Sequence, residues 1–174
     1  MNPERRGYWP QEPEGEAQVP DVGELRFRGP ETLCGCERSR SFCLDDPETR
    51  PQVATPEAAA ELLVPFLTGL DREHCMMLAL DTKHRLIAAT RVSVGSADHT
   101  FIAPREVFRD ALAHGASAIV LGHNHPSGDP EPSADDRGIT ARLASAGATL
   151  GIEMLDHLIV GSHDWISLAR RGAL

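Results

Sequence analysis

The chain has 174 residues, 41% of them hydrophobic and 25% charged, which is typical of one globular domain with a real core plus a shorter segment. Its formal net charge is -9. Proteins that bind nucleic acid usually have a basic surface, so the charge disfavours nucleic-acid binding. No apolar run approaches the roughly 18 to 20 residues that cross a bilayer, and no secretory signal is visible, so we expect no membrane partner and a cytoplasmic location.

The first part of the chain differs in composition from the rest. Residues 1–50 are rich in proline, glycine and acidic residues and show little apolar periodicity. This composition predicts an extended or partly disordered N-terminal arm at 1–50, followed by a domain at 51–174. Within the arm, residues 25–28 alternate between apolar and polar and indicate one edge strand.

Three of the four cysteines, Cys34, Cys36 and Cys43, cluster in this arm. They could form a structural zinc or redox site, but the usual C-x-x-C spacing and a fourth ligand are missing. Disulfides are rare in cytosolic proteins, so we do not predict one here. Cys75 lies alone in an apolar segment and is expected to be a small buried residue.

From Thr55 onward, helical and extended patterns follow one another. Thr55 and Pro56 are a cap and a first-turn proline for a helix with an apolar face, which Pro65 is expected to kink or interrupt. Residues 75–80 and 86–94 are apolar and predict two strands joined by a polar turn.

The second half of the domain continues the alternation. Residues 104–114 predict a second helix that ends at Gly115, and residues 118–121 predict a short buried strand. A third helix fits residues 134–146. Closing strands follow at 150–155 and 158–160, with a turn or helix at 165–171. Strands that interleave with helices indicate an α/β domain of two or three layers.

The most informative stretch is GHNHPSG at residues 122–128, followed by Ser133 and Asp136. Residues two apart on an extended chain point to the same side, so both imidazole rings can converge at the end of the preceding strand. Zinc accepts nitrogen and carboxylate oxygen, and a catalytic zinc typically has three protein ligands and one open position. We therefore predict that His123, His125 and Asp136 hold one zinc ion per chain.

The S-x-x-D pair has a second interpretation, because Ser133 and Asp136 match a helix capping box. The two roles need not compete, since the start of a helix is a rigid mounting for a ligand. Ser133 is also the candidate in this motif for a hydrogen bond to a developing oxyanion. Glu73, which opens the strand at 75–80, is the best placed acid for proton transfer.

Asp156 and His157 form a polar pair between the two closing strands. One interpretation is that they orient a metal ligand from the outside. The other is that they form a turn with a hydrogen-bonded histidine. The sequence leaves both open.

His123-x-His125, Ser133 and Asp136, with an acidic residue about fifty positions upstream, resemble the JAMM (Jab/MPN) metalloprotease signature. The wider sequence is similar to the RadC-like branch of that family, and the resemblance covers approximately residues 55–168. The matching blocks are HNHPSGDPEPSADD at 123–136, APREVFRDAL at 103–112 and LGIEMLDHLIVG at 150–161.

The resemblance implies a JAMM/MPN fold, which is a cytidine-deaminase-like α/β fold with a mixed central sheet flanked by helices. It implies zinc held by His123, His125 and Asp136, with Glu73 as the general base and Ser133 stabilising the tetrahedral intermediate. Fuller RadC-like proteins carry a helix-hairpin-helix pattern in their N-terminal part. That pattern is not found in residues 1–50, which weakens the DNA-repair association for this chain.

These observations favour a zinc-dependent metallohydrolase, a metallopeptidase or isopeptidase that uses a metal-activated water with Glu73 as base. One alternative is a DNA-linked protein of the RadC repair type, such as a metal-dependent nuclease. Another is a non-catalytic MPN-like binding module. The expected partner is a peptide or protein substrate, and a lysine-linked or C-terminal modifier peptide is suggested by analogy alone. The sequence identifies neither the substrate nor the oligomeric state.

Overall fold

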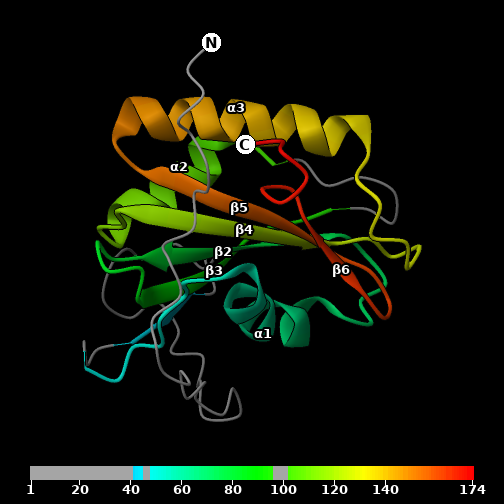
Figure 1. Ribbon diagram of the computed structural model, residues 1–174, viewed down its shortest axis with the longest axis horizontal. Helices are drawn as coiled ribbons and strands as arrows, with labels where there is room; N and C mark the ends of the chain where they lie inside the picture. Colours follow the sequence, from blue (N-terminus) through cyan, green and yellow to red (C-terminus); the bar gives the residue numbers. More distant parts are fainter. Residues whose placement is uncertain (1–40, 45–47, 96–101) are drawn as a thin grey trace.

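The computed structural model describes residues 41–44, 48–95 and 102–174 (Figure 1). The helices in these residues are α1 (Pro56–Leu67), α2 (Pro104–Ala113) and α3 (Ala134–Leu150). The strands are β1 (Ser41–Cys43), β2 (His74–Leu80), β3 (Leu86–Val94), β4 (Ala118–Asn124), β5 (Glu153–Val160) and β6 (Trp165–Ser167).

The described strands form one mixed sheet in the order β1-β3-β2-β4-β5-β6. Strands β4 and β5 run parallel, and the other neighbouring pairs run antiparallel. Helix α1 covers one face of the sheet, and α2 and α3 cover the other (Figure 1). The predicted α/β fold, with a mixed central sheet flanked by helices, is confirmed.

Helix α1 begins where the sequence predicts. The Oγ1 atom of Thr55 accepts a hydrogen bond of 3.2 Å from the backbone N–H of Ala58, and Pro56 occupies the first turn. The predicted interruption at Pro65 is wrong, because this residue lies in the last turn and removes only one hydrogen bond near the helix end. The buried side chains between α1 and the sheet include Leu63, Leu67, Met76, Leu78, Val120 and Leu158.

The opposite face of the sheet packs against α2 and α3. Buried side chains in this layer include Met77, Phe108, Ile119, Leu121 and Leu143. Cys75 belongs to the same layer, as predicted, and its burial, together with the nearby charge of Glu73, raises the pKa of the thiol well above its ordinary value. Because alternate residues of a strand share a face, His123 continues the row of Ile119 and Leu121 toward α3.

Three predicted boundaries need correction. Strand β4 does not stop at residue 121 but runs through His123 to Asn124, so the first histidine lies in the sheet. Helix α3 continues past residue 146 to Leu150 and ends at Gly151, whose φ of 72° is left-handed. The segment 165–171 begins with β6, and only the residues after it form turns.

The two predicted closing strands are in fact the single strand β5. A turn, one of the two interpretations of Asp156 and His157, is not formed, because both residues are fully buried within the strand. Each of the two has hydrogen-bond partners, so their burial leaves no polar group unsatisfied and the strand can continue.

Strand β5 contains a bulge against β4, which is uncommon between parallel strands. Ile119 pairs with Met154, but the next residue, Val120, pairs with Asp156. From there on Leu121 pairs with His157, so the skipped residue turns His157 rather than Asp156 toward the α3 face. The bulge thereby brings a third histidine beside His123.

Several predictions lie outside the described residues, namely the edge strand at 25–28 and the positions of Cys34 and Cys36. Residues 41–43 form β1 and pair with β3, although the division of the chain at residue 51 stays a prediction. Among the described helices, none combines the length and apolar character needed to span a membrane.

Candidate metal centre

The two histidines of the motif lie where β4 leaves the sheet. His123 is 1% exposed and stands opposite Cys75 of β2. The backbone N–H of His125 donates a hydrogen bond of 2.9 Å to the carbonyl of Val160, so pairing with β5 continues one residue beyond the strand. Both rings therefore come from an extended, fixed backbone, as the spacing predicts.

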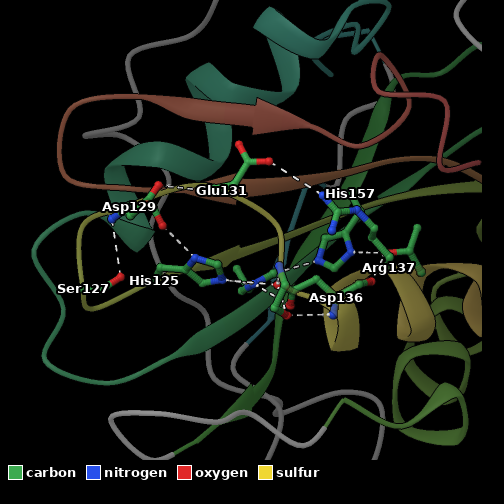
Figure 2. Close-up of polar contacts among 10 residues, drawn as sticks. His125, Ser127, Asp129, Glu131, Asp136, Arg137 and His157 are labelled. Carbon is green, nitrogen blue, oxygen red and sulfur yellow. Dashed lines mark hydrogen bonds and ion pairs between the residues drawn. The ribbon is translucent and has the colours of Figure 1, made fainter.

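Asp136 completes the cluster from the first turn of α3. Its Oδ1 lies 3.2 Å from Nε2 of His123, and its Oδ2 lies 3.5 Å from Nε2 of His125. The two Nε2 atoms are 3.1 Å apart. One ligand atom from each residue lies within 4.8 Å of the others, so the three side chains could hold a single metal ion. In Figure 2 the dashed lines connect Asp129 to His125 and His125 to Asp136, and His157 joins the same network through the ring of His123.

The charges of this cluster are strongly coupled. Burial favours the protonated form of Asp136, but the close contacts with the imidazole rings of His123 and His125 outweigh it and hold the pKa of Asp136 well below its usual range. The hydrogen bond to Asp136 raises the pKa of His125, burial opposes this, and the charge of Glu73 adds to the rise. Asp136 therefore keeps its negative charge beside the imidazole nitrogens, which favours a cation there.

The orientation of His125 is set by the loop that follows it. Its Nδ1 lies 2.8 Å from the carbonyl oxygen of Asp129, and a carbonyl can only accept, so Nδ1 carries the proton. In the neutral ring the Nε2 lone pair then faces Asp136 and His123. The N–H of Gly128 donates back to the carbonyl of His125 at 3.0 Å, which closes the turn.

The donor set fits a divalent cation. Two imidazole nitrogens and one carboxylate are ligands that zinc accepts readily, and related divalent transition metals take the same set. These groups bring lone pairs and negative charge close together, and a bound cation would relieve their mutual repulsion. The side chains of His125 and Asp136 are each 14% exposed, so the cluster is open to solvent on their side.

Ser133 forms the capping box that the sequence predicts. Its Oγ accepts a hydrogen bond of 3.1 Å from the N–H of Asp136, and its own N–H donates to Asp136 Oδ2 at 2.8 Å. The hydroxyl also donates to Oδ2 at 2.5 Å. The same carboxylate therefore caps the helix and faces the histidines, and the two interpretations of this residue are compatible.

Glu73 directly precedes β2 and comes to the same end of the sheet as the histidines. Antiparallel pairing places Cys75 opposite His123, and Glu73 lies further toward His125. Its carbonyl accepts a hydrogen bond of 2.8 Å from Gly95, and its charge acts on His125. Glu73 is not among the three residues of the ligand group.

Asn124 is a residue that the sequence analysis did not single out. It is 3% exposed, and its side chain reaches the chain on both sides of Glu73. Its Oδ1 accepts a hydrogen bond of 2.8 Å from the N–H of His74, and its Nδ2 donates to the carbonyl of Arg72 at 2.9 Å. The middle residue of the H-x-H motif therefore fixes the backbone that carries Glu73.

The structure separates the roles of Asp156 and His157. The Asp156 carboxylate accepts hydrogen bonds from the N–H of His157 and Ala169 and from the hydroxyl of Ser167, at 2.7, 2.9 and 2.6 Å. Burial raises its pKa even though these hydrogen bonds oppose the rise. Asp156 thus ties β5 to the end of the chain, whereas His157 contacts His123.

Comparison with known proteins agrees with this architecture. A family model described as the RadC-like JAB domain matches residues 53–173. A UPF0758 protein from Desulfitobacterium hafniense is 41% identical over 160 residues, which cover 88% of this chain and 70% of that protein. A UPF0758 protein from Alcanivorax borkumensis is 41% identical over 162 residues, covering 93% of this chain and 71% of that protein. Another, from Desulforudis audaxviator, is 40% identical over 161 residues, covering 90% and 70%.

Proposed function

Because the chain belongs to the RadC-like JAB domain family, we propose that it is a zinc-dependent hydrolase that cleaves peptide or isopeptide bonds. The observation that carries the proposal is the convergence of His123, His125 and Asp136 at the end of the sheet where Glu73 also lies. The similar UPF0758 proteins carry a name that specifies no activity, so the proposal rests on the chemistry of this site.

A divalent metal held by these three ligands would supply Lewis-acid activation of a water molecule and of a carbonyl group. Glu73 takes the proton of the attacking water and delivers it to the leaving amine, which is the task of a general base and then a general acid. Asn124 holds the backbone on both sides of Glu73, and the N–H of Gly95 donates to the carbonyl of Glu73 itself. The backbone that carries the Glu73 carboxylate is therefore fixed in position.

Ser133 is proposed to stabilise the oxyanion that develops on the substrate. Its side chain is exposed beside Asp136, so a substrate carbonyl arriving from solvent can reach the hydroxyl. The hydroxyl has to turn from Oδ2 of Asp136 toward the substrate to donate this hydrogen bond. The backbone N–H of Ser133 still satisfies the same oxygen at 2.8 Å, so the helix cap survives that rotation.

Removal and restoration of metal test this function directly. We expect the full chain, freed of metal by a chelator, to be inactive against libraries of linear peptides and of lysine-linked isopeptides. Addition of zinc is expected to restore cleavage, and mass spectrometry would show products that have gained one water. Asp136→Asn is the matched inactive control, since it retains an acceptor for the helix cap but not the carboxylate charge. Cleavage at full rate in the chelated protein would contradict the proposal. Zinc-loaded protein that cleaves nothing in either library would favour the binding-module alternative.

A further inference from the structure

A buried row of hydrogen bonds connects the His123 ring to the backbone of Asp136. His123 Nδ1 lies 2.8 Å from Nε2 of His157, and His157 Nδ1 lies 2.7 Å from the hydroxyl of Thr140. That hydroxyl lies 2.6 Å from the backbone carbonyl of Asp136. His157 and Thr140 are both fully buried, and they come from β5 and α3. The row therefore links the strand and the helix that carry the candidate ligands.

The chemistry of each group fixes the direction of these hydrogen bonds. The carbonyl of Asp136 can only accept, so the hydroxyl of Thr140 donates its hydrogen there. The oxygen of Thr140 must then accept from Nδ1–H of His157. In the neutral His157 ring, Nε2 is left as an acceptor, and it takes the Nδ1–H of His123.

These hydrogen bonds also determine the state of the second ring nitrogen of His123, Nε2. With Nδ1 protonated, Nε2 bears the lone pair, and this atom lies 3.2 Å from Asp136 Oδ1 within the candidate metal centre. We propose that His157 and Thr140 are positioning residues that hold His123 in this single tautomer, with the Nε2 lone pair facing the metal. The inference rests on the proposed metal site and names two residues that stand behind it.

This arrangement differs from the usual partners of a metal-binding histidine, which are a carboxylate, a backbone carbonyl or water. A neutral imidazole satisfies His123 without adding a second negative charge, so the ligand group keeps only the charge of Asp136. The row also ends on the backbone of Asp136, so it fixes the position of one ligand relative to another. Ligands that are already held in position bind a metal ion more tightly than ligands that must first be ordered.

Thr140 offers a matched pair of variants that separates this role from packing. Thr140→Val keeps the shape but removes the hydroxyl, whereas Thr140→Ser keeps the hydroxyl. We expect Thr140→Val to weaken zinc binding by about 10-fold or more, in the range of known outer partners of metal ligands. Thr140→Ser is expected to bind zinc nearly as tightly as the wild type. Competition of the full-length proteins with a chromophoric chelator for zinc measures these affinities without any substrate.

The tautomers can be read directly in the metal-free protein. Nitrogen-15 NMR of histidine-labelled wild type is expected to show both His123 and His157 protonated at Nδ1. In Thr140→Val the His157 signal should shift toward a mixture of tautomers, because its Nδ1–H has lost its acceptor. The tautomer of His157 distinguishes a positioning role from a general loss of stability. A variant that is merely less stable would keep the wild-type tautomer in its folded molecules.

Either result can overturn the inference. Wild-type His157 protonated at Nε2 would reverse the row of hydrogen bonds, and this test needs no variant to fold. Equal zinc affinity in Thr140→Val and Thr140→Ser would overturn the inference while leaving the proposed function intact. A wild-type protein that binds no zinc would overturn the proposed function, and the positioning role with it.

Discussion

Purified protein is expected to hold about one equivalent of zinc after dialysis, and His123→Ala or Asp136→Asn is expected to lose it. His123 Nε2 and the Asp136 carboxylate lie 3.2 Å apart and face each other, so each supplies a ligand atom that no other described residue replaces. Outer partners of metal ligands alone are worth about 10- to 100-fold in affinity, so loss of a direct ligand should exceed about 100-fold. Elemental analysis of the dialysed proteins measures the result.

Controls for these variants come from the same parts of the chain. Asp135→Asn changes an exposed neighbour in the first turn of α3, and His163→Ala removes an exposed histidine that is not part of the ligand group. Both should retain full zinc content. Asp136→Asn leaves an amide oxygen to accept from the N–H of Ser133, so the helix cap, worth about 1 kcal/mol, is largely preserved. Full metal content in both ligand variants would refute the assignment.

Glu73→Gln is expected to lower kcat by roughly 100- to 10,000-fold, the usual contribution of a general acid–base group, while zinc content stays unchanged. Glutamine has the same length as glutamate but cannot accept the proton of water. Its backbone is held by Asn124 and Gly95, so the substitution should leave the local fold in place. Steady-state kinetics on a substrate found in the library screen, with metal analysis of the same sample, gives both quantities.

A matched substitution separates this effect from a change of surface charge. Glu153→Gln alters an exposed glutamate at the start of β5, at the opposite end of the sheet, where Glu153 pairs with Ala118 rather than with the histidines. It should behave as the wild type. Equal turnover by Glu73→Gln and the wild type would exclude Glu73 as the base. Loss of zinc from Glu73→Gln would instead make this residue a ligand.

Helix α1 and strands β2 and β3 could be predicted from the sequence because their signals are local. Thr55 and Pro56 mark the start of α1, and the apolar runs of β2 and β3 are separated by a polar turn. The single strand β5 could not be predicted, because Asp156 and His157 interrupt its apolar pattern and are compatible with a turn between two strands. Only the partners of Asp156, which lie in β6 and beyond it, show why a carboxylate is buried there.

The candidate site divides in the same way. His123, His125 and Asp136 could be named because their spacing alone brings rings and carboxylate to one strand end and one helix start. The role of Asn124 depends on partners far away in the chain, since its hydrogen bond to His74 joins residues 50 positions apart. The role of Thr140 depends on His157, which lies 17 positions further along the chain. The bulge that turns His157 toward His123 cannot be recognised from the pattern of apolar residues in the sequence.

X-ray absorption at the zinc edge of the zinc-loaded wild-type protein tests the metal centre most directly. We expect nitrogen and oxygen neighbours only, at about 2.0 to 2.2 Å, with the scattering pattern of two imidazole rings, for His123, His125 and Asp136. Sulfur neighbours at about 2.3 Å would place the zinc on cysteines instead and would contradict the account.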